Sequence, residues 1–466
     1  MRQLDQIIKA YDVRGIVPDQ LDADLAHDVG VAFVRVLGIA ARDGGPGVVV
    51  VGHDMRPSGP DLVAAFADGV RGEGCDVILI GLASTDGLYF ASGSLDIPGA
   101  MFTASHNPAQ YNGIKLCRAG AAPVGQDTGL RAIRDMIEAG VGPASAKTPG
   151  EIRSQDMLTD YARYLRALVD VSAIRRLKVV IDAGNGMGGF TVPAVLGDGA
   201  GLAALPLDID EMYFELDGSF PNHEANPIEP ANLVDLQARV LEVGAHLGLA
   251  FDGDADRCFV VDERGEAVNP STLTALIAAR ELAKHPGSSI IHNLITSRAV
   301  PEVVLEHGGV PIRTRVGHSF IKATMADTNA VFGGEHSGHF YFRDFWRADS
   351  GMLAALHTIA ALGETSAGTT LSSLLHTYDR YASSGEINTE VVDQAQVTAE
   401  IRSIYEARDG VTVDDLDGLT FTGDTWWFNV RPSNTEPLLR LNAEAQDEAT
   451  MIALRDDVLA VMRAGR

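Results

Sequence analysis

The sequence predicts an α/β protein with several domains, and three observations support this prediction. The chain has 466 residues, which is too long for one ordinary core and corresponds to about three or four domains of roughly 150 residues each. Apolar β-branched runs recur along the chain and end in loops rich in Gly or Asp. Helical patterns lie between these runs, and this alternation of strand and helix favours doubly wound layers.

The apolar runs are typical of buried parallel strands. The loops at the carboxyl ends of such strands are where open α/β sheets bind ligands. We expect strands at residues 47–51, 178–181, 247–251 and 288–291. We expect helices at residues 60–69, 130–139, 158–168 and 233–243.

The last part of the chain, from about residue 371, has a different pattern. Short strands are predicted at residues 412–415, 419–422 and 425–431, and residues 438–444 alternate between apolar and polar side chains. A helix is predicted from about residue 447 to residue 462. This part is therefore expected to form a small α+β domain after three α/β domains.

The domain boundaries follow from shifts in composition. Residues 140–150 and 363–370 are rich in small and turn-forming residues, which suggests linkers. A further boundary is placed before Phe251. We therefore expect four domains, at residues 1–145, 146–250, 251–368 and 369–466, with clefts between them that are available for binding.

Composition and charge limit the classes of partner. Hydrophobic residues make up 46% of the chain and charged residues 21%, which is normal for a folded soluble protein. The formal net charge of -26 argues against sequence-independent binding of nucleic acid, which needs a basic surface. Any phosphate site must therefore be a local cluster of arginines and backbone amides.

Cysteine usage and hydropathy indicate the compartment. Cys75, Cys117 and Cys258 are widely separated and lack metal-ligand spacing, so neither a disulfide framework nor a zinc site is expected. The first 15 residues are polar, and Arg35 interrupts the apolar stretch at residues 29–41. We expect a cytoplasmic protein without membrane spans.

The most informative motif contains Ser105. Residues 103–108 read TASHNP, and Tyr111-Asn112-Gly113 and Lys115 follow, so a hydroxyl nucleophile stands among groups that can handle a phosphate. Adjacent residues on an extended chain point to opposite faces, so His106 is predicted to be poorly placed to activate Ser105. Activation is expected to come from another part of the chain.

An acidic motif follows directly after a predicted strand, where residues 252–257 read DGDADR. A turn could converge Asp252, Asp254 and Asp256 on a hard cation, and oxygen ligands suit magnesium or calcium. An EF-hand-like calcium loop is one alternative, but that loop needs glycine where this chain has Arg257. A solvated acidic turn is the other. We favour a catalytic divalent-cation site.

A glycine-rich motif follows another predicted strand, where residues 184–189 read GNGMGG. The pattern G-x-G-x-x-G occurs in dinucleotide sites, and Asp208 and Asp210 follow at about the distance of a ribose-binding acid. A tight strand-to-helix turn explains the same glycines without any ligand. We favour the turn.

A candidate sugar-binding motif occurs at residues 334–339, which read GEHSGH. Its carboxylate, hydroxyl and imidazole groups could accept and donate hydrogen bonds to sugar hydroxyls, and a polar surface turn is the alternative. Zinc binding by His336 and His339 is not favoured, because the spacing is not that of H-E-x-x-H.

Two further motifs could bind phosphate. Residues 431–437 read RPSNTEP and offer a guanidinium, hydroxyls, an amide and loop N–H groups that together can hold an anion. Residues 9–15 read KAYDVRG, and Arg14 in front of a glycine could reach a phosphorylated residue. A plain turn and a capped strand entry are the respective alternatives.

Taken in order, five motifs strongly resemble the alpha-D-phosphohexomutase family, and they look most like its bacterial phosphomannomutase and phosphoglucomutase members. These motifs are residues 11–15, 103–108 with Lys115, 252–257, 334–339 and 431–435. The resemblance spans nearly the whole chain, and the five motifs together are far more specific than any one of them.

The resemblance implies four domains around a central cleft, namely three related α/β domains and a C-terminal α+β domain. It also implies that Ser105 is carried as a phosphoserine in the resting enzyme. One magnesium ion per chain would be held by the phosphoryl oxygen of that residue and by the carboxylates of Asp252, Asp254 and Asp256.

The remaining site residues are also implied by the resemblance. Arg14, Lys115 and Arg257 would border the transferring group, with His106 as a supporting contact. Glu335 and Ser337 would contact sugar hydroxyls, and Tyr11 and His318 would also bind substrate. Arg431, Ser433, Asn434 and Thr435 would hold the phosphate that does not react.

The implied activity is that of an isomerase that interconverts mannose 6-phosphate and mannose 1-phosphate through a hexose 1,6-bisphosphate, which also acts as activator. Positioning and charge stabilisation carry most of such a phosphoryl transfer. Lys115 or His339 would take the sugar's proton, and the sequence does not choose between them. The protein would act as a monomer or homodimer.

Other activities remain open at this point. Glucose phosphate is the second choice of substrate, as in a phosphoglucomutase or a dual-specificity hexose mutase, and glucosamine phosphate is the least favoured. The alternative from another class is a non-enzymatic calcium- or sugar-binding protein.

The chain departs from the family's pattern at two places. Many relatives have Asp-Val-Lys where this chain reads Asn293-Leu294-Ile295, so an expected lysine is missing. Arg298, Arg313 or Arg315 could replace its charge. His336 also occupies a position that varies among relatives, which leaves the choice of sugar uncertain.

Overall fold

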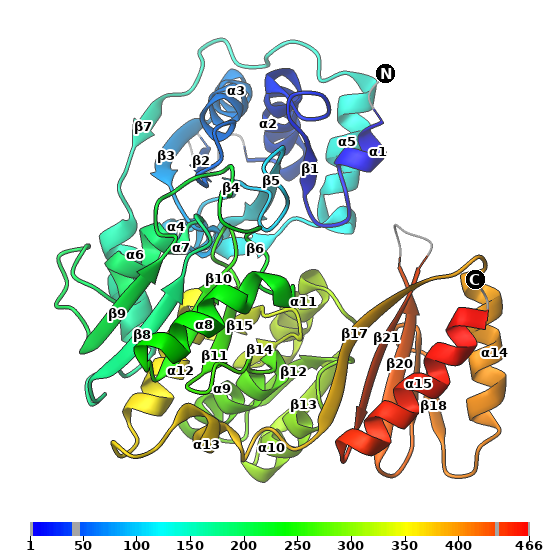
Figure 1. The fold of residues 1–466 in the computed structure, drawn as a ribbon. Coiled ribbons are helices and arrows are strands. Elements are labelled where there is room, and N and C mark those ends of the chain that lie inside the picture. Colours follow the sequence, from blue (N-terminus) through cyan, green and yellow to red (C-terminus); the bar gives the residue numbers. More distant parts are fainter. Residues whose placement is uncertain (1–2, 40–46, 434–437, 465–466) are drawn as a thin grey trace. The chain divides into compact units, whose positions relative to one another are not determined.

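The computed structural model describes residues 3–39, 47–433 and 438–464 (Figure 1). The chain divides into two compact units. The first contains residues 1–270 and 337–374, and the second contains residues 271–336 and 375–466. Within the described ranges, no helix is both long enough and apolar enough to span a membrane.

The first unit begins with a mixed sheet in the order β1-β5-β4-β2-β3-β7, with β6 paired to β5. Its strands are β1 (Val13–Ile16), β2 (Val48–His53), β3 (Asp76–Leu82), β4 (Gly99–Phe102), β5 (Tyr111–Arg118), β6 (Ala122–Pro123) and β7 (Ile152–Ser154). Its helices are α1 (Leu4–Ile7), α2 (Ala23–Leu37), α3 (Gly59–Gly72), α4 (Thr85–Leu95) and α5 (Leu130–Ala139). The parallel strands β2, β3 and β4 form its centre.

Aromatic side chains fill the core of this first sheet. Phe66 of α3 packs edge-on against Phe102 of β4, with ring centroids 5.5 Å apart, and also contacts Phe33 of α2. All three side chains are fully buried, so the two helices are fixed against one face of the sheet. The carboxyl ends of β2 and β4 are thereby held at one edge.

A second sheet of the first unit has the order β11-β10-β8-β9. Its elements are β8 (Leu177–Asp182), β9 (Leu207–Met212), β10 (Leu247–Phe251), β11 (Cys258–Asp262), α6 (Leu158–Leu168), α7 (Gly188–Val195) and α8 (Val234–Val243). Strand β10 is parallel to β8 and antiparallel to β11. Every residue of β10 is buried, which explains its unbroken apolar sequence.

The first unit also contains a later segment of the chain. The hairpin of β15 (Phe340–Phe342) and β16 (Ala348–Asp349) leads into α12 (Gly351–Gly363), and α13 (Leu371–Leu375) follows at the change of unit. Ser350 caps α12, because its hydroxyl accepts a hydrogen bond from the N–H of Leu353.

The second unit contains a parallel sheet and an antiparallel sheet. In the parallel sheet β12 (Ser289–Asn293) lies between β13 (Val310–Thr314) and β14 (Phe332–Gly334). Its helices are α9 (Pro270–Lys284), α10 (Ala299–Glu306) and α11 (His318–Thr328).

The C-terminal antiparallel sheet has the order β17-β21-β20-β19-β18. Its elements are β17 (Ala382–Glu390), α14 (Gln394–Glu406), β18 (Thr412–Asp414), β19 (Leu419–Thr422), β20 (Trp426–Pro432), β21 (Leu438–Ala445) and α15 (Glu448–Ala464). One face is apolar and packs Phe421 and Phe428 against Tyr405 of α14, with Tyr405 and Phe428 ring centroids 4.6 Å apart. The expected α+β domain is therefore present.

The strand pairing of the structure runs across two of the expected domain boundaries. Strand β7 (Ile152–Ser154) pairs with β3, so the first sheet continues beyond residue 145. The boundary before Phe251 cuts β10, and β11 pairs with β10 in the second sheet. The acidic loop therefore connects two strands of the second sheet instead of opening a third domain.

An ion pair in the second sheet gives stability a pH dependence. The Asp182 carboxylate, at the end of β8, accepts hydrogen bonds from the N–H of Gly184 at 2.8 Å and contacts His223 Nε2 at 2.9 Å. This hydrogen bond to Asp182 raises the pKa of His223 despite partial burial. The pair therefore stabilises the fold fully below the unfolded-state pKa of about 6.5 and loses its contribution as pH rises through the raised value.

We predict that His223→Gln lowers the free energy of unfolding more at pH 6 than at pH 9. Chemical denaturation of wild type and variant across this range would measure the difference. His376→Gln is the control, because His376 is exposed. A cost of His223→Gln that is the same at both pH values would contradict the assignment.

Candidate active site

Three loops of the first unit meet backbone to backbone, at the carboxyl ends of β4, β8 and β10. A Cβ atom on Gly253 would lie 2.5 Å from the carbonyl oxygen of Ser105. A Cβ atom on Gly186 would lie 2.7 Å from the carbonyl oxygen of Gly253, which accepts a hydrogen bond from the N–H of Met187 at 2.9 Å. The glycines of residues 184–189 thus let this turn support the acidic loop, which agrees with the ligand-free explanation of that motif.

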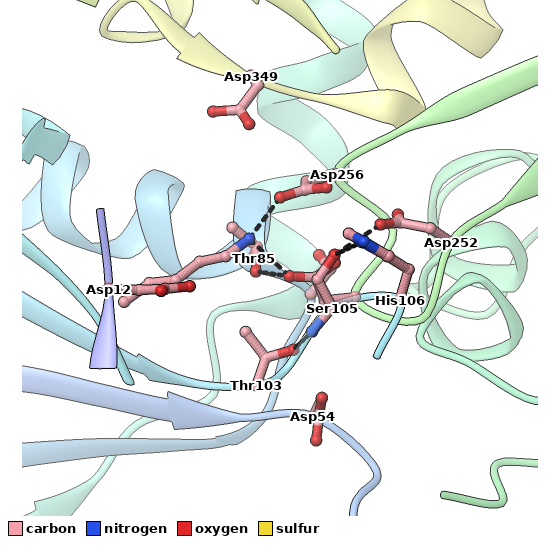
Figure 2. Close-up of polar contacts among 12 residues, drawn as sticks. Asp12, Asp54, Thr85, Thr103, Ser105, His106, Asp252, Asp256 and Asp349 are labelled. Atoms are coloured by element: carbon pink, nitrogen blue, oxygen red, sulfur yellow. Dashed lines mark hydrogen bonds and ion pairs between the residues drawn. The ribbon is translucent and has the colours of Figure 1, made fainter. Parts of the chain in front are cut away.

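Ser105 lies at the centre of this contact and is 5% exposed (Figure 2). Its Oγ donates a hydrogen bond to Asp252 Oδ2 at 2.9 Å and lies 3.2 Å from His106 Nδ1. The expectation that His106 points away was wrong, because Ser105 has a left-handed backbone with φ of 49° and the chain there is not extended. Both neighbours of the hydroxyl can accept its proton.

The acidic loop carries three buried carboxylates. One ligand atom from each of Asp252, Asp254 and Asp256 lies within 4.8 Å of the others. Asp254 Oδ1 and Asp256 Oδ1 are buried and have no hydrogen-bond partner in the described part of the chain. Oxygen atoms left in this condition fit a hard cation. The hairpin geometry of β10 and β11 does not support a calcium loop of the EF-hand type.

The electrostatics of this cluster reflect burial and like charge. Burial, followed by the charges of Asp256 and Asp254, raises the pKa of Asp252 to about 8, although Arg257 opposes the rise. Burial would also raise the pKa of Asp254, but Lys115 and Thr85 lower it overall. A divalent cation would relieve the same repulsion.

Lys115 and His339 both border Asp256. The Lys115 ammonium, projecting from β5, donates to Asp254 Oδ2 at 2.8 Å and Asp256 Oδ2 at 2.6 Å. His339 Nε2 lies 3.7 Å from Asp256 Oδ1, and its Nδ1 lies 3.0 Å from the hydroxyl of Ser337. Both candidates for the base therefore stand beside the carboxylate cluster.

Two arginines also stand at this site. Arg257 Nε donates to Asp252 Oδ2 at 2.9 Å, and its Nη2 is buried without a partner in the described ranges. Arg14 Nη1, on β1, donates to Asn107 Oδ1 at 2.5 Å, and Arg14 also pairs with Asp12. Burial and the charges of Arg257 and Arg14 lower the pKa of His106 well below its usual value. Positive charge therefore gathers around Ser105.

Arg56 was missed in the sequence, and it holds the Ser105 loop in place. Its side chain is fully buried and donates to the carbonyl oxygens of Ser105, Asn107, Pro108 and Tyr111 at 2.9, 2.6, 3.0 and 2.8 Å. Asp54 Oδ2 accepts a further bond from Arg56 Nε at 3.2 Å. The position of Asp54 after a predicted strand gave a hint of this role, but the four carbonyl partners are remote in sequence.

Helix α4 supports the acidic loop from another side, and this contact was also missed. Thr85 Oγ1 donates to Asp254 Oδ2 at 2.6 Å, and the N–H of Thr85 donates to the carbonyl of Asp254 at 3.0 Å. The next residue, Asp86, is buried and accepts hydrogen bonds from Tyr161 at 2.8 Å and Ser350 at 2.6 Å. Three separate segments of the first unit are thus joined at the start of α4.

The sugar motif is divided between the two units. Ser337 and His339 belong to the first unit, and Glu335 belongs to the second. Glu335 Oε2 accepts hydrogen bonds from Asn293 Nδ2 at 3.2 Å and from the N–H of Gly317 at 3.4 Å. His318 begins α11, and its side chain lies outside what the structure describes. Tyr11 is 36% exposed just before β1.

The missing lysine position is filled by apolar packing within the second unit. Ile295 is 7% exposed and packs with Leu294, Val316 and Trp427. Trp427 Nε1 also donates to the buried Glu444 carboxylate at 2.7 Å. These side chains form an apolar contact between the parallel and antiparallel sheets of this unit. This contact occupies the position at which many relatives are expected to have a lysine.

The three arginines that could replace that charge differ in their surroundings. Arg313 pairs with Asp414 and donates to Thr420, and Arg298 lies over the ring of Tyr381. Arg315 is exposed and lies over the ring of Phe320 at 5.1 Å. Arg313 is thus already engaged by a carboxylate.

The candidate phosphate loop of the C-terminal sheet is described in part. Arg431 is 8% exposed near the end of β20 and pairs with Glu386 of β17. The N–H of Ser433 donates to the carbonyl of Leu438 at 2.9 Å, which closes the loop. Asn434 and Thr435 lie outside the described residues.

Comparison with known families identifies the class of protein. Four successive regions match the phosphoglucomutase/phosphomannomutase alpha/beta/alpha domains I, II and III and the C-terminal domain, at residues 5–141, 159–265, 269–381 and 386–461. The chain therefore belongs to the phosphoglucomutase/phosphomannomutase family. The resemblance inferred from five motifs and the four-domain α/β fold class are confirmed.

Individual relatives cover nearly the whole chain. It is 41% identical over 459 residues to phosphohexose mutases of Xanthomonas campestris pv. campestris, covering 98% of this chain and 99% of the relative. It is 38% identical to a phosphomannomutase of Escherichia coli, covering 98% of each chain. A crystal structure of a family protein from Burkholderia thailandensis superposes with a TM-score of 0.87 at 31% identity, covering 100% and 98% of the two chains.

The chain is therefore an isomerase of the phosphohexomutase type, and the alternative of a non-enzymatic binding protein is wrong. Its site residues of the first unit bring together a hydroxyl, a cation-binding cluster and positive charge. This combination suits phosphoryl transfer, which depends on positioning and charge stabilisation.

We predict that Arg56→Lys lowers turnover about 100-fold, because three ammonium donors cannot replace the four carbonyl bonds and the bond to Asp54, and Ser105 then loses its position. Steady-state kinetics on hexose phosphates would measure the loss. Arg163→Lys is the control, because Arg163 is exposed on α6. Wild-type turnover of Arg56→Lys would show that the loop keeps its shape without this guanidinium.

Proposed function

We propose that this protein interconverts mannose 6-phosphate and mannose 1-phosphate, with Ser105 as the carrier of the phosphoryl group. The observation that supports this most directly is the Ser105 hydroxyl, 2.9 Å from Asp252 in a cluster of three buried carboxylates. A serine in this position could exchange a phosphoryl group with a sugar beside a cation. Relatives named phosphomannomutase, 37–38% identical over nearly the whole chain, favour mannose.

A magnesium ion would be held by Asp252, Asp254 and Asp256 together with a phosphoryl oxygen on Ser105. Such an ion supplies positive charge to the equatorial oxygens of the transferring group. The Oδ1 atoms of Asp254 and Asp256, which are buried and accept no hydrogen bond from the described residues, support this assignment. Magnesium is favoured over softer metals, because the donor set consists of oxygen atoms.

In the first half-reaction the phosphoryl group of phosphoserine 105 would pass to the free hydroxyl of the sugar. The bond from phosphorus to Ser105 Oγ breaks, the bond to the sugar oxygen forms, and Asp252 stands within reach of the serine oxygen. His339 would take the proton of the sugar hydroxyl. Although burial opposes it, the charges of Asp254 and Asp256 hold the pKa of Lys115 well above its usual value, so its ammonium would instead stabilise charge. Arg257 and Arg14 would stabilise the charge on the group in transfer.

In the second half-reaction the hexose 1,6-bisphosphate would present its other end and return that phosphoryl group to Ser105. Glu335 and Ser337 would hold the sugar hydroxyls, and Arg431 and Ser433 would hold the phosphate that does not react. Added hexose 1,6-bisphosphate would act as activator, because it phosphorylates Ser105. We infer a cytoplasmic protein that acts on hexose phosphates as a monomer or homodimer.

A glucose phosphate substrate is the second candidate. A relative from Pseudomonas syringae pv. tomato, 36% identical over 96% of this chain, is named phosphomannomutase/phosphoglucomutase. Catalytic efficiencies on mannose, glucose and glucosamine phosphates, measured with magnesium and a trace of bisphosphate, would decide between them. Higher efficiency on glucose 1-phosphate than on mannose 1-phosphate would overturn the mannose assignment.

We predict that Ser105→Ala lowers turnover at least about 1,000-fold while the protein remains folded, because a methyl group cannot carry phosphate. Intact-mass measurement should show one phosphoryl group on wild type after incubation with bisphosphate and none on the variant. Ser94→Ala, on the exposed side of α4, is the control. Retained turnover in Ser105→Ala would rule out the carrier role.

A further inference from the structure

Two arginines of the C-terminal sheet lie directly opposite each other. Arg431 of β20 and Arg440 of β21 are paired residues in the antiparallel register, so their side chains leave the same face of the sheet. Arg431 is 8% exposed, and the side chain of Arg440 is 34% exposed. Like charges at directly opposed positions destabilise a sheet, so this pair needs an anion to offset its cost.

Glu386 of the neighbouring strand β17 supplies a carboxylate to both arginines. Its Oε2 accepts a hydrogen bond from Arg431 Nη2 at 2.5 Å, and its Oε1 accepts one from Arg440 Nη1 at 3.1 Å. Its side chain is 25% exposed, so solvent reaches this group. One carboxylate thus bridges two guanidinium groups, in the manner that a phosphate could.

The bridge leaves donors unused. The Nε atoms of Arg431 and Arg440 are both buried and have no hydrogen-bond partner in the described part of the chain. Each of the two guanidinium groups therefore donates one hydrogen bond to Glu386, although each has the geometry to donate two to the same anion. An anion with more oxygen atoms than a carboxylate would use these guanidinium groups more fully.

A β-bulge directs Glu386 toward the arginines. The register of β17 against β21 shifts between Ser383 and Glu386, and Gly385 has a left-handed φ of 66°. Bulges change the direction of a side chain and are common beside functional sites. The N–H of Ala443 donates to the Ser384 hydroxyl at 2.9 Å, which fixes the bulge.

His336 of the candidate sugar-binding motif also interacts electrostatically with Glu386 and Arg431. His336 lies in the same unit as the C-terminal sheet. Burial and Arg431 lower the pKa of His336, whereas Glu386 opposes this. The bridge therefore lies close to a residue next to Glu335.

We propose that Arg440 joins Arg431 in binding the substrate's non-reacting phosphate, and that Glu386 competes with this phosphate for both guanidinium groups. This proposal rests on the proposed function, in which a two-ended bisphosphate must present first one end and then the other to Ser105, so that its two phosphates exchange places. A resident carboxylate lowers the affinity for phosphate, so the bound phosphate can detach and the intermediate can turn around between the half-reactions. Binding that is equally strong throughout the cycle would lower KM without helping turnover.

The test compares phosphate binding in charge-matched variants. Titration calorimetry with inorganic phosphate is expected to show about five- to tenfold tighter binding by Glu386→Gln and about tenfold weaker binding by Arg440→Gln. Glu390→Gln is the matched control, since it makes the same charge change at an exposed position of β17, and binding should stay within about twofold. Unchanged or weaker binding by Glu386→Gln would overturn the competition.

Kinetics give a second readout on the same variants. Glu386→Gln should lower KM for the sugar phosphate and also lower kcat, because detachment of the bound phosphate becomes slower. An unchanged phosphate affinity of Arg440→Gln would remove Arg440 from the site. If wild type isomerises no hexose phosphate, the proposed function fails, whereas the calorimetric result still decides the competition.

A folding control keeps the test decisive. If Glu386→Gln does not fold, because two arginines then face each other unopposed, Glu386→Asp retains the charge but cannot span both groups. It is expected to bind phosphate about two- to threefold more tightly than wild type. Phosphate should also raise the melting temperature of Glu386→Asp more than that of wild type. Equal stabilisation of the two proteins would contradict the competition.

Discussion

The contact between Gly253 and the carbonyl of Ser105 determines what the rest of the first unit can do. Because residue 253 has no side chain, the acidic loop comes close enough for Asp252 to bond the serine hydroxyl. The turn at Gly186 supports the acidic loop in the same way, because the absence of a side chain at residue 186 lets its backbone approach the backbone of Gly253. Three strands from two sheets thereby place a nucleophile and a cation-binding cluster at hydrogen-bonding distance.

The neighbourhood of Ser105 is held by buried polar groups instead of apolar packing. Arg56 uses its guanidinium on four carbonyl oxygens of one loop, and Asp54 neutralises its charge. Thr85 holds Asp254 from the start of α4. A buried network that is satisfied in this way fixes geometry strongly, and removal of one member leaves others unpaired.

Much of the fold could be predicted from the sequence, because its signals are local. The apolar run of β10 and the helical pattern of α5 and α6 have the bounds that were expected. The acidic and serine motifs are also local, since each carries its chemistry in consecutive residues. Their meeting was implied only by resemblance to a family, because no local pattern specifies a contact between residues 105 and 252.

The failures have equally physical causes. The orientation of His106 was predicted wrongly because the backbone of Ser105 is left-handed, and no local sequence pattern predicts that conformation for a serine. Arg56 and Arg440 were overlooked because their partners are remote carbonyls in one case and neighbouring strands in the other. The boundary before Phe251 was placed on the assumption that a loop of functional residues opens a domain, whereas this loop connects the two strands of a hairpin.

The bulge that directs Glu386 has a further consequence for the edge of the C-terminal sheet. Strand β17 is one of the two outer strands of its sheet, and an outer strand of nine residues offers a template for pairing with another chain. A bulge disrupts the regular spacing of the backbone N–H and C=O groups along such a strand. The bulge that places the charge of Glu386 beside the two arginines thus also makes the sheet edge a poorer template for another chain.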